Sequence, residues 1–319
     1  MDSVSKLFEL YLARSDLRPS SVRFKKRAFG YFVKWFGDVP VGGITLAMAE
    51  DYKTLLAKGR SKRSANGYIS NLRPFFVWLK RHGKIATNPF ADIKLYRITE
   101  SRRGTFSLLE LGRLIKIASR IWRVRLCLGL LGCRRGEVLN LVVQDINWSA
   151  SESYILLSPK RATAYTWEWG IKDHCIRMVA LPERMNFCGI AAELHRDIMR
   201  LTEDLRNGQP YICIDEKHYN KLIGWQRDGI LKDEHVHDPI GNFQRRFRNL
   251  QGRAGIYPTK RFHELRASFC TRMIPKIGLE RTADALGHSN VEITRQYDRR
   301  SQKSLVVEIG RIAENCYQP

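Results

Sequence analysis

Five residues in the second part of the chain have side chains suited to chemistry on a phosphate group. They are Arg134, His263, Arg266, His288 and Tyr297, and Tyr297 follows His288 by nine residues. Two arginines can hold the non-bridging oxygens of an attacked phosphate with forked donors, which a lysine would not reproduce. A tyrosine hydroxyl can attack the phosphorus, and the phenolate is a competent leaving group for the reverse step. Together these residue types predict a site that transfers a phosphate to the protein and back.

Each of these residues also has an ordinary structural explanation when it is taken alone. Arg134 precedes a glutamate by three residues, which on a helix is usually a structural ion pair. His263 and Arg266 share one helix face, which is more often a surface feature than a site. His288 could lie at a helix end, and Tyr297 could be a core tyrosine. The prediction therefore depends on the five residues acting together.

In their order and surroundings, these residues resemble the catalytic domain of the tyrosine recombinase (phage integrase) family. That family carries an Arg in a Gly-x-Arg-x-x-Glu context, then His-x-x-Arg, then Leu-Gly-His, and a Tyr about nine residues later. The matching stretches here are Gly132 to Glu137, His263 to Arg266, Leu286 to His288, and Tyr297. The resemblance covers roughly residues 105–305, and the helical, basic first hundred residues resemble the family's core-binding domain.

The resemblance implies a site-specific recombinase that cuts and rejoins DNA through a covalent bond to its tyrosine. Tyr297 would be the nucleophile, and Arg134 and Arg266 would hold the phosphate oxygens. His288 would donate to the same charge, and His263 would assist the nucleophile's proton or bind the phosphate. In this scheme the arginines and a lysine take the place of a metal ion, so neither a metal nor a cofactor is expected.

The lysine that the family uses lies on a β-hairpin and would protonate the leaving 5′ oxygen as the general acid. Lys172 precedes Arg177 by five residues, the position at which relatives carry that lysine. Lys160 and Arg161, near the end of the first predicted strand, are the alternatives, and a solvated hairpin lysine is the plain structural explanation. The segment 163–173 is rich in Trp and Tyr where relatives often have a shorter turn, and it is interpreted as a long hairpin tip or an insertion.

One further cluster has metal-binding residue types. The run from Asp233 to Asp238 contains two histidines and three acidic residues. No distant partner residues complete a ligand set, so the run is interpreted as a polar loop before a helix that begins at Gly241. The seven cysteines are odd in number and lack metal-ligand or redox spacing, which indicates reduced thiols that mostly fill the core.

The net charge of +23 points to a polyanionic partner. Residues 1–100 carry 19 Lys and Arg against 8 Asp and Glu, and residues 101–319 carry 36 against 24. This even spread predicts two basic bodies that bind nucleic acid, with a ribosome-associated or merely soluble basic protein as the alternative. The longest apolar run, Leu126 to Cys133, is too short to span a membrane, and the N-terminus lacks a signal-peptide pattern. A cytoplasmic, DNA-associated protein without membrane contact is therefore expected.

The elements that would position these residues are mostly helices. Two strand-like runs, 154–157 and 176–181, predict a small sheet, and Ser107 to Glu110 forms a capping box. The expected fold class is mainly α with a small antiparallel β-sheet (α+β). Residues 1–91 would form a helical DNA-binding domain, 92–104 a linker, and 105–319 the catalytic domain with a C-terminal helical tail. Helical periodicity predicts helices over 4–12, 22–36, 45–56, 64–79, 184–205, 241–250, 262–274, 280–286 and from about 291 onward.

The resemblance also implies an assembly. Two domains would form a C-shaped clamp on double-stranded DNA, and a homotetramer would join two recombination sites, with accessory or directionality proteins as further candidate partners. Because the chain enters directly into the core-binding-like helices, a simple two-domain type, Xer-like or a mobile-element integrase, is expected. The amphipathic stretch after Tyr297 would pack on its own domain or dock on a neighbouring protomer.

Two other functions are compatible with much of the same residue set. A type IB topoisomerase uses a similar Tyr, Arg, His and Lys set, but it relaxes supercoils as a monomer without paired sites. A non-catalytic DNA-binding regulator could use the same scaffold, yet it has no use for Tyr297 or Lys172. The Leu-Gly-His motif and the helical N-terminal unit favour the recombinase.

Overall fold

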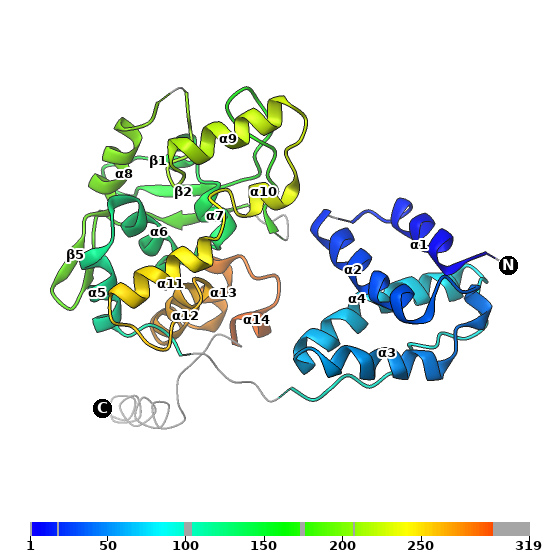
Figure 1. The fold of residues 1–319 in the computed structure, drawn as a ribbon. Helices are drawn as coiled ribbons and strands as arrows, with labels where there is room; N and C mark the ends of the chain where they lie inside the picture. The colour runs from blue at the N-terminus through cyan, green and yellow to red at the C-terminus, as the bar shows by residue number, and fades with distance from the viewer. Residues whose placement is uncertain (1, 18, 99–103, 173–175, 207, 296–319) are drawn as a thin grey trace, which may run out of the picture. The chain divides into compact units, whose positions relative to one another are not determined.

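The computed structural model describes residues 2–17, 19–98, 104–172, 176–206 and 208–295. The chain divides into two compact units, Met1–Ser101 and Arg102–Pro319. The first unit is built from helices, whereas the second combines helices with short strands (Figure 1). Within the described ranges, no helix is long and apolar enough to cross a membrane.

The helices of the first unit begin at polar capping residues. Ser3, Thr45 and Ser61 each accept a hydrogen bond from the backbone two to three residues into their helix. Every helix predicted for this region is confirmed, with ends that differ by three residues or fewer. The described elements are α1 (Val4–Ala13), α2 (Pro19–Phe36), the 3-10 turn η1 (Val41–Gly43), α3 (Leu46–Lys58) and α4 (Lys62–Arg81).

Aromatic rings fill the core of the first unit. Phe8 of α1 stacks on Phe29 of α2 with 3.9 Å between ring centroids, and Phe75 of α4 meets Phe8 edge-on at 5.1 Å. This core leaves no room for unpaired cations, which would lose their hydration. The basic side chains of α2 that are exposed to solvent are Arg23, Lys26, Arg27 and Lys34.

The chain beyond α4 remains fastened to the first unit. Ile93 is buried in its core, and the side-chain amide of Asn66 makes two hydrogen bonds of 2.8 Å with the backbone of Tyr96. Arg73 supports the same segment by donating from Nε to the Phe90 carbonyl over 3.1 Å. The segment from 92 to 96 therefore packs on the first unit, which extends to Ser101.

The second unit is organised around α6 (Arg120–Leu130), in which every residue from Val124 to Leu130 is buried. The predicted capping box at the start of α5 is confirmed, because Ser107 and Glu110 each accept the other's backbone N–H. The other described helices are α5 (Leu108–Ile117), α7 (Arg135–Leu139), η2 (Val143–Asp145), α8 (Leu194–Glu203), α9 (Glu216–Arg227), α10 (Asp233–His237), α11 (Phe243–Arg253), α12 (His263–Ile277), α13 (Leu279–Leu286) and α14 (Val291–Arg295).

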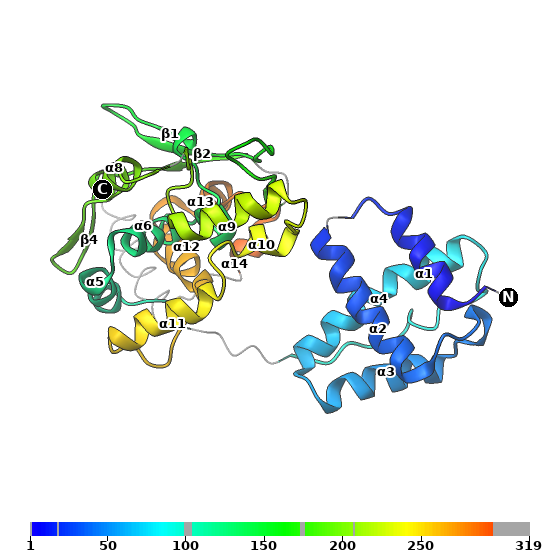
Figure 2. The same ribbon diagram turned by 45° about the horizontal axis from the view of Figure 1, so that its top comes forward.

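A three-stranded antiparallel sheet lies along one edge of the second unit (Figure 2). Its order is β1 (Ile146–Asn147), β2 (Tyr154–Leu157), β3 (Arg177–Ala180), and Leu157 lies opposite Arg177 in the register. Burial alternates along β3, so one face packs on the helices and the other meets solvent. Arg177 occupies a core-facing position, which is unusual for a cation.

Three details differ from the sequence-based expectations. The helix predicted over 184–205 is wrong in its first half, where β4 (Met185–Phe187) and β5 (Ile190–Ala192) form a hairpin. Cys188 and Gly189 make its two-residue turn with φ of 48° and 84°, a conformation that favours a primed turn over a helix. The run 233–238, expected as a loop, forms the short helix α10, and α9 was not predicted.

Candidate active site

Arg134 is held at the start of α7 by a carboxylate three residues later. Glu137 is buried, and its Oε2 accepts the Arg134 backbone N–H over 2.7 Å, while its Oε1 accepts from Arg134 Nη1 over 3.0 Å. The ion pair that was the plain explanation of Arg134 therefore exists. It leaves the arginine partly exposed, with 17% of its side-chain surface accessible, so the pair orients Arg134 without burying it.

Gly132 supplies the turn that brings the Arg134 segment against the following motifs. Its φ is +89°, and a Cβ at this position would lie 2.6 Å from Leu286 Cδ2. Only glycine adopts this backbone conformation without strain and allows so close an approach. The Gly132 carbonyl is thereby presented to the interior, where it accepts hydrogen bonds from Arg266 and Arg177.

Arg266 joins the three motif stretches directly. It is only 1% exposed; its Nη1 donates to the Gly132 carbonyl, and its Nη2 donates to the Leu286 carbonyl over 2.7 Å and to His288 Nε2 over 2.9 Å. Within the described residues its Nε has no hydrogen-bond partner. Burial, reinforced by the positive charges of Arg134 and Arg177, lowers the Arg266 pKa to about 10. The residue remains a cation at neutral pH.

His288 is held in one tautomer. Its Nε2 accepts from Arg266, so Nδ1 carries the proton and donates to Thr294 Oγ1 over 2.6 Å. Burial and the charges of Arg266 and Arg134 lower the His288 pKa to about 4, so the ring is neutral at physiological pH. Both ring nitrogens are engaged, and a direct bond from His288 to a phosphate requires one of these contacts to be exchanged.

His263 begins α12, three residues before Arg266. The residue is exposed to solvent. Partial desolvation and the positive charges of Arg266, Arg134 and Lys172 lower its pKa to about 4. The imidazole is therefore neutral at physiological pH, but the surrounding cations oppose its protonation. An anionic phosphate bound among these cations would offset their charge and raise the His263 pKa towards the value that a general base requires.

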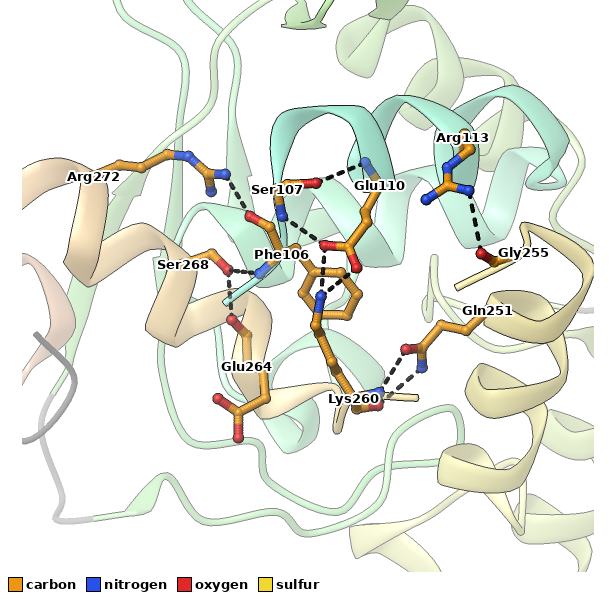
Figure 3. A network of polar contacts seen from close by, with 10 residues as sticks. All are labelled: Phe106, Ser107, Glu110, Arg113, Gln251, Gly255, Lys260, Glu264, Ser268 and Arg272. Carbon is orange, nitrogen blue, oxygen red and sulfur yellow. Dashed lines mark hydrogen bonds and ion pairs between the residues drawn. The ribbon is translucent and has the colours of Figure 1, made fainter. Parts of the chain in front are cut away.

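The helix that carries His263 and Arg266 is fastened from its other side (Figure 3). The Phe106 backbone N–H donates to Ser268 Oγ over 3.0 Å, and Arg272 Nη2 donates to the Phe106 carbonyl over 2.6 Å. Lys260, just before α12, forms an ion pair with Glu110 above the Phe106 ring. Because these contacts hold the rear of α12, its site-facing residues have a fixed position relative to α5.

Lys172 and its alternative, Lys160, have different environments. Lys172 is exposed, and it follows Ile171, which is buried. Lys160 instead forms a buried ion pair, with 2.5 Å between its Nζ and Asp145 Oδ1, and also donates to the Ser158 carbonyl over 2.9 Å. A lysine held in this way cannot reach a leaving group without losing its counterion, which favours Lys172 as the proton donor.

The aromatic segment before Lys172 forms a hairpin, as expected, with Lys160 paired to Trp169 and an exposed tip at residues 162–165, but its tryptophans pack inward. Trp167 is fully buried and stacks on Tyr211 at 4.0 Å with a 7° interplanar angle. Its Nε1 donates to Asn140 Oδ1 over 2.8 Å. Arg134 and Asn140 are the N-cap and C-cap residues of α7, so the same short helix supports Arg134 and the segment that leads to Lys172.

Sequence reasoning missed three participants in this arrangement, namely Glu137 as a bridge, Arg177 and Thr294. A signal for Arg177 exists in the sequence, because alternation along the predicted strand places it on the same face as Val179 and Leu181. Tyr297 and the tail after it lie outside the described residues. Among the described residues, no group of three or more His, Cys, Asp or Glu side chains is placed to hold a metal ion.

Comparison with known proteins identifies the family. A sequence profile of the phage integrase family matches residues 113–304. The chain belongs to the phage integrase family. It is therefore a site-specific DNA recombinase of the tyrosine type. The chain is similar to a tyrosine recombinase of Thermosipho africanus (strain TCF52B). The two are 24% identical over 313 residues, which cover 93% of this chain and 95% of that protein.

Solved integrase structures share the fold of this family member. A fragment of the Tn1549 transposon integrase in complex with circular intermediate DNA superposes with a TM-score of 0.70 at 16% identity, covering 98% of this chain and 100% of that one. A lambda integrase dimer bound to a core site gives 0.66 at 17% identity, covering 93% and 96%. The fold class expected from the sequence, mainly α with small antiparallel sheets, is confirmed.

Proposed function

We propose that this recombinase cleaves one DNA strand with Tyr297 and holds it as a 3′-phosphotyrosine, with Arg134 and Arg266 binding the attacked phosphate. The observation that supports this most strongly is the contact set of Arg266, which reaches Gly132, Leu286 and His288 at once. Residues that are far apart in sequence thereby surround one buried guanidinium, whose positive charge suits a phosphate anion.

The chemical step follows from the residue types. The bond from Tyr297 Oη to phosphorus forms as the bond from phosphorus to the 5′ oxygen breaks. The tyrosine's proton passes to the neutral His263, and Lys172 gives a proton to the leaving 5′ oxygen. Arg134 and Arg266 stabilise the charge that develops on the non-bridging oxygens, a contribution of about 3–4 kcal/mol for each well-placed donor. Rejoining is the same step in reverse.

His288 has an indirect part in this scheme. As a neutral ring that accepts from Arg266 and donates to Thr294, it fixes the direction of the Arg266 guanidinium. When a phosphate takes over the Arg266 donors, His288 Nε2 is released, and it can donate to the same oxygens once it has taken up a proton. The phosphate therefore replaces contacts that already exist, which keeps the site preorganised.

We also propose how the domains and subunits of this recombinase are organised. Residues 1–91 serve as the core-binding domain and 105–319 as the catalytic domain. Of residues 92–104, proposed as the linker, residues 92–96 pack on the core-binding domain. The working form is a homotetramer on two DNA sites inside the cytoplasm, with accessory or directionality proteins as additional partners. A similar fold occurs in a lambda integrase tetramer bound to a Holliday junction, with a TM-score of 0.63 and 16% identity over 91% of this chain and 78% of that one. The net charge of +23 suits such a DNA-bound assembly.

The test is a nicked suicide duplex that carries the enzyme's own recombination site, found from inverted repeats flanking the gene. Loss of a short 5′ fragment after cleavage prevents rejoining and traps the protein on DNA. The proposal expects a covalent adduct for the wild-type protein and none for Tyr297→Phe, with DNA binding unchanged. Binding without any adduct in the wild type would favour a non-catalytic regulator, and relaxation of plasmids that lack the site would favour a topoisomerase.

A further inference from the structure

We propose that Arg177 is a positioning residue, which holds the Arg134 and His288 segments in register with the strand that follows Lys172. This inference rests on the proposed function, because it concerns the geometry of the same site. Arg177 begins β3, five residues after Lys172, and only 5% of its side-chain surface is exposed. It is too enclosed to touch DNA, so it would act through its neighbours.

The three hydrogen bonds of Arg177 all end beside proposed catalytic residues. Nη2 donates to Glu137 Oε2 over 2.7 Å and to the Gly132 carbonyl over 3.2 Å, and Nη1 donates to the Ala285 carbonyl over 2.9 Å. Gly132 and Glu137 flank Arg134, and Ala285 precedes His288 by three residues. One side chain of the sheet therefore fixes both loops.

Two of these acceptors are shared with the proposed phosphate-binding arginines. Glu137 pairs with Arg134 through one oxygen and with Arg177 through the other, and the Gly132 carbonyl accepts from both Arg177 and Arg266. A shift of Arg177 would therefore move Arg134 through the carboxylate and Arg266 through the carbonyl. Coupling of this kind is direct, because each link is a single hydrogen bond.

Stability alone does not account for an arginine at this place. The position lies on the core face of β3, in line with the apolar Val179, and Arg177 Nε has no hydrogen-bond partner within the described residues. Replacing both partners of a buried ion pair by well-packed apolar residues is often neutral or stabilising, so the pair of Arg177 with Glu137 is weak evidence for a role in stability. The requirement is geometric, because three acceptors on two loops must be held at once.

Lysine would not replace this function. Its ammonium is a compact point charge, whereas the guanidinium is a planar fork whose two Nη atoms point to different acceptors. A lysine could keep the pairing with Glu137, but it could not also span Gly132 and Ala285. Arg177→Lys therefore keeps the positive charge but loses the forked hydrogen bonds, and Arg177→Met loses both the charge and the hydrogen bonds.

A matched control is available in the same unit. Arg125 of α6 is 3% exposed, and its Nε and Nη2 both donate to the Cys213 carbonyl, over 3.2 and 2.8 Å. It is another buried arginine bonded to backbone, but the hydrogen bonds and ring contact described for it are with Cys213 and Trp122, outside the motif segments. Arg125→Lys therefore reports what loss of a buried guanidinium does to the fold alone.

The experiment measures single-turnover cleavage of the suicide duplex, the Kd for an uncleavable duplex, and the Tm of each variant. We expect cleavage to fall about 100-fold in Arg177→Met and about 10-fold in Arg177→Lys, the scale expected for small misplacements of catalytic groups. The Kd should stay within about threefold of wild type. Arg125→Lys should lower the Tm while cleavage by the folded protein stays at the wild-type rate.

Three outcomes would overturn the inference. One is wild-type cleavage by folded Arg177→Met. Another is a loss of cleavage in the Arg177 variants that Arg125→Lys shows to the same extent at an equal fall in Tm. Failure of both Arg177 variants to fold would make the residue structural. If the wild-type protein itself forms no adduct, the proposed function fails, and the role of Arg177 fails with it.

Discussion

Arg266 Nη2 and His288 Nε2 lie 2.9 Å apart, and the hydrogen bond between them fixes the protonation of both residues. The guanidinium can only donate, so the imidazole must accept and must be neutral on that nitrogen. The bond therefore links the binding of phosphate by the arginine to the proton state of the histidine.

This relationship predicts an acid-sensitive fold. In the native protein the His288 pKa is near 4, below the ordinary value of 6.5, so between these values the unfolded chain binds a proton that the native chain does not. The contribution of His288 to the free energy of unfolding is fully present above about pH 6.5, and it is lost as the pH falls towards about 4. In His288→Asn the Tm should depend less steeply on pH in this window. An identical pH dependence of Tm in mutant and wild type would contradict the lowered pKa of His288.

Arg266→Lys should abolish most cleavage while leaving DNA binding. A lysine cannot reach Gly132, Leu286 and His288 together, so the expected loss in single-turnover rate is about 100-fold or more. Arg272→Lys on the same helix is the control, since its bond to the Phe106 carbonyl can be kept by one ammonium donor. Equal rates for the two variants would remove Arg266 from the proposed mechanism.

Lys172→Ala and Lys160→Ala should fail in different ways. Lys172→Ala should cleave slowly at wild-type stability, and a 5′-bridging phosphorothiolate, whose sulfur leaves without a proton, should restore the rate. Lys160→Ala leaves Asp145 buried without its partner and should lose about 3–5 kcal/mol of unfolding free energy in urea. Sulfur rescue of Lys160→Ala instead of Lys172→Ala would exchange the two roles.

Gly132→Ala should destabilise the second unit. The new Cβ would meet Leu286 Cδ2 at 2.6 Å in a backbone conformation with φ of +89°, and such strain costs about 1–3 kcal/mol. Gly170→Ala is the control, because its Cβ would meet no atom within 4 Å. Urea unfolding curves of the two variants would be the measurement. Equal stability would show that Leu286 relaxes away from the turn.

Local signals in the sequence were sufficient for most helices. The capping box at Ser107 and the apolar periodicity of α2 and α4 depend on neighbours within a few residues, so they could be predicted. The hairpin at Cys188 and Gly189 could not, because the preference for φ above zero is hidden in one ordinary residue beside one glycine. Secondary structure therefore failed where an unusual turn interrupts an otherwise helical pattern.

For the site, the sequence could predict the residue types but not the contacts between them. The motif spacing identified the proposed residues, but the contacts that organise them are long-range. The Gly132 carbonyl meets Arg266, 134 residues later, and Arg177, 45 residues later. A backbone carbonyl that accepts from two distant arginines cannot be recognised in the sequence, because every residue has such a carbonyl. Trp167 likewise suggested an insertion, because its partners Tyr211 and Asn140 become neighbours only in the fold.

The most direct measurement is identification of the amino acid that carries the DNA. The trapped adduct would be digested with protease and nuclease, and the modified peptide sequenced by mass spectrometry. The account predicts a nucleotide on the oxygen of Tyr297, within the peptide between Arg295 and Arg299, and no adduct from Tyr297→Phe. A nucleotide on any other residue, or an adduct that persists in Tyr297→Phe, would contradict it.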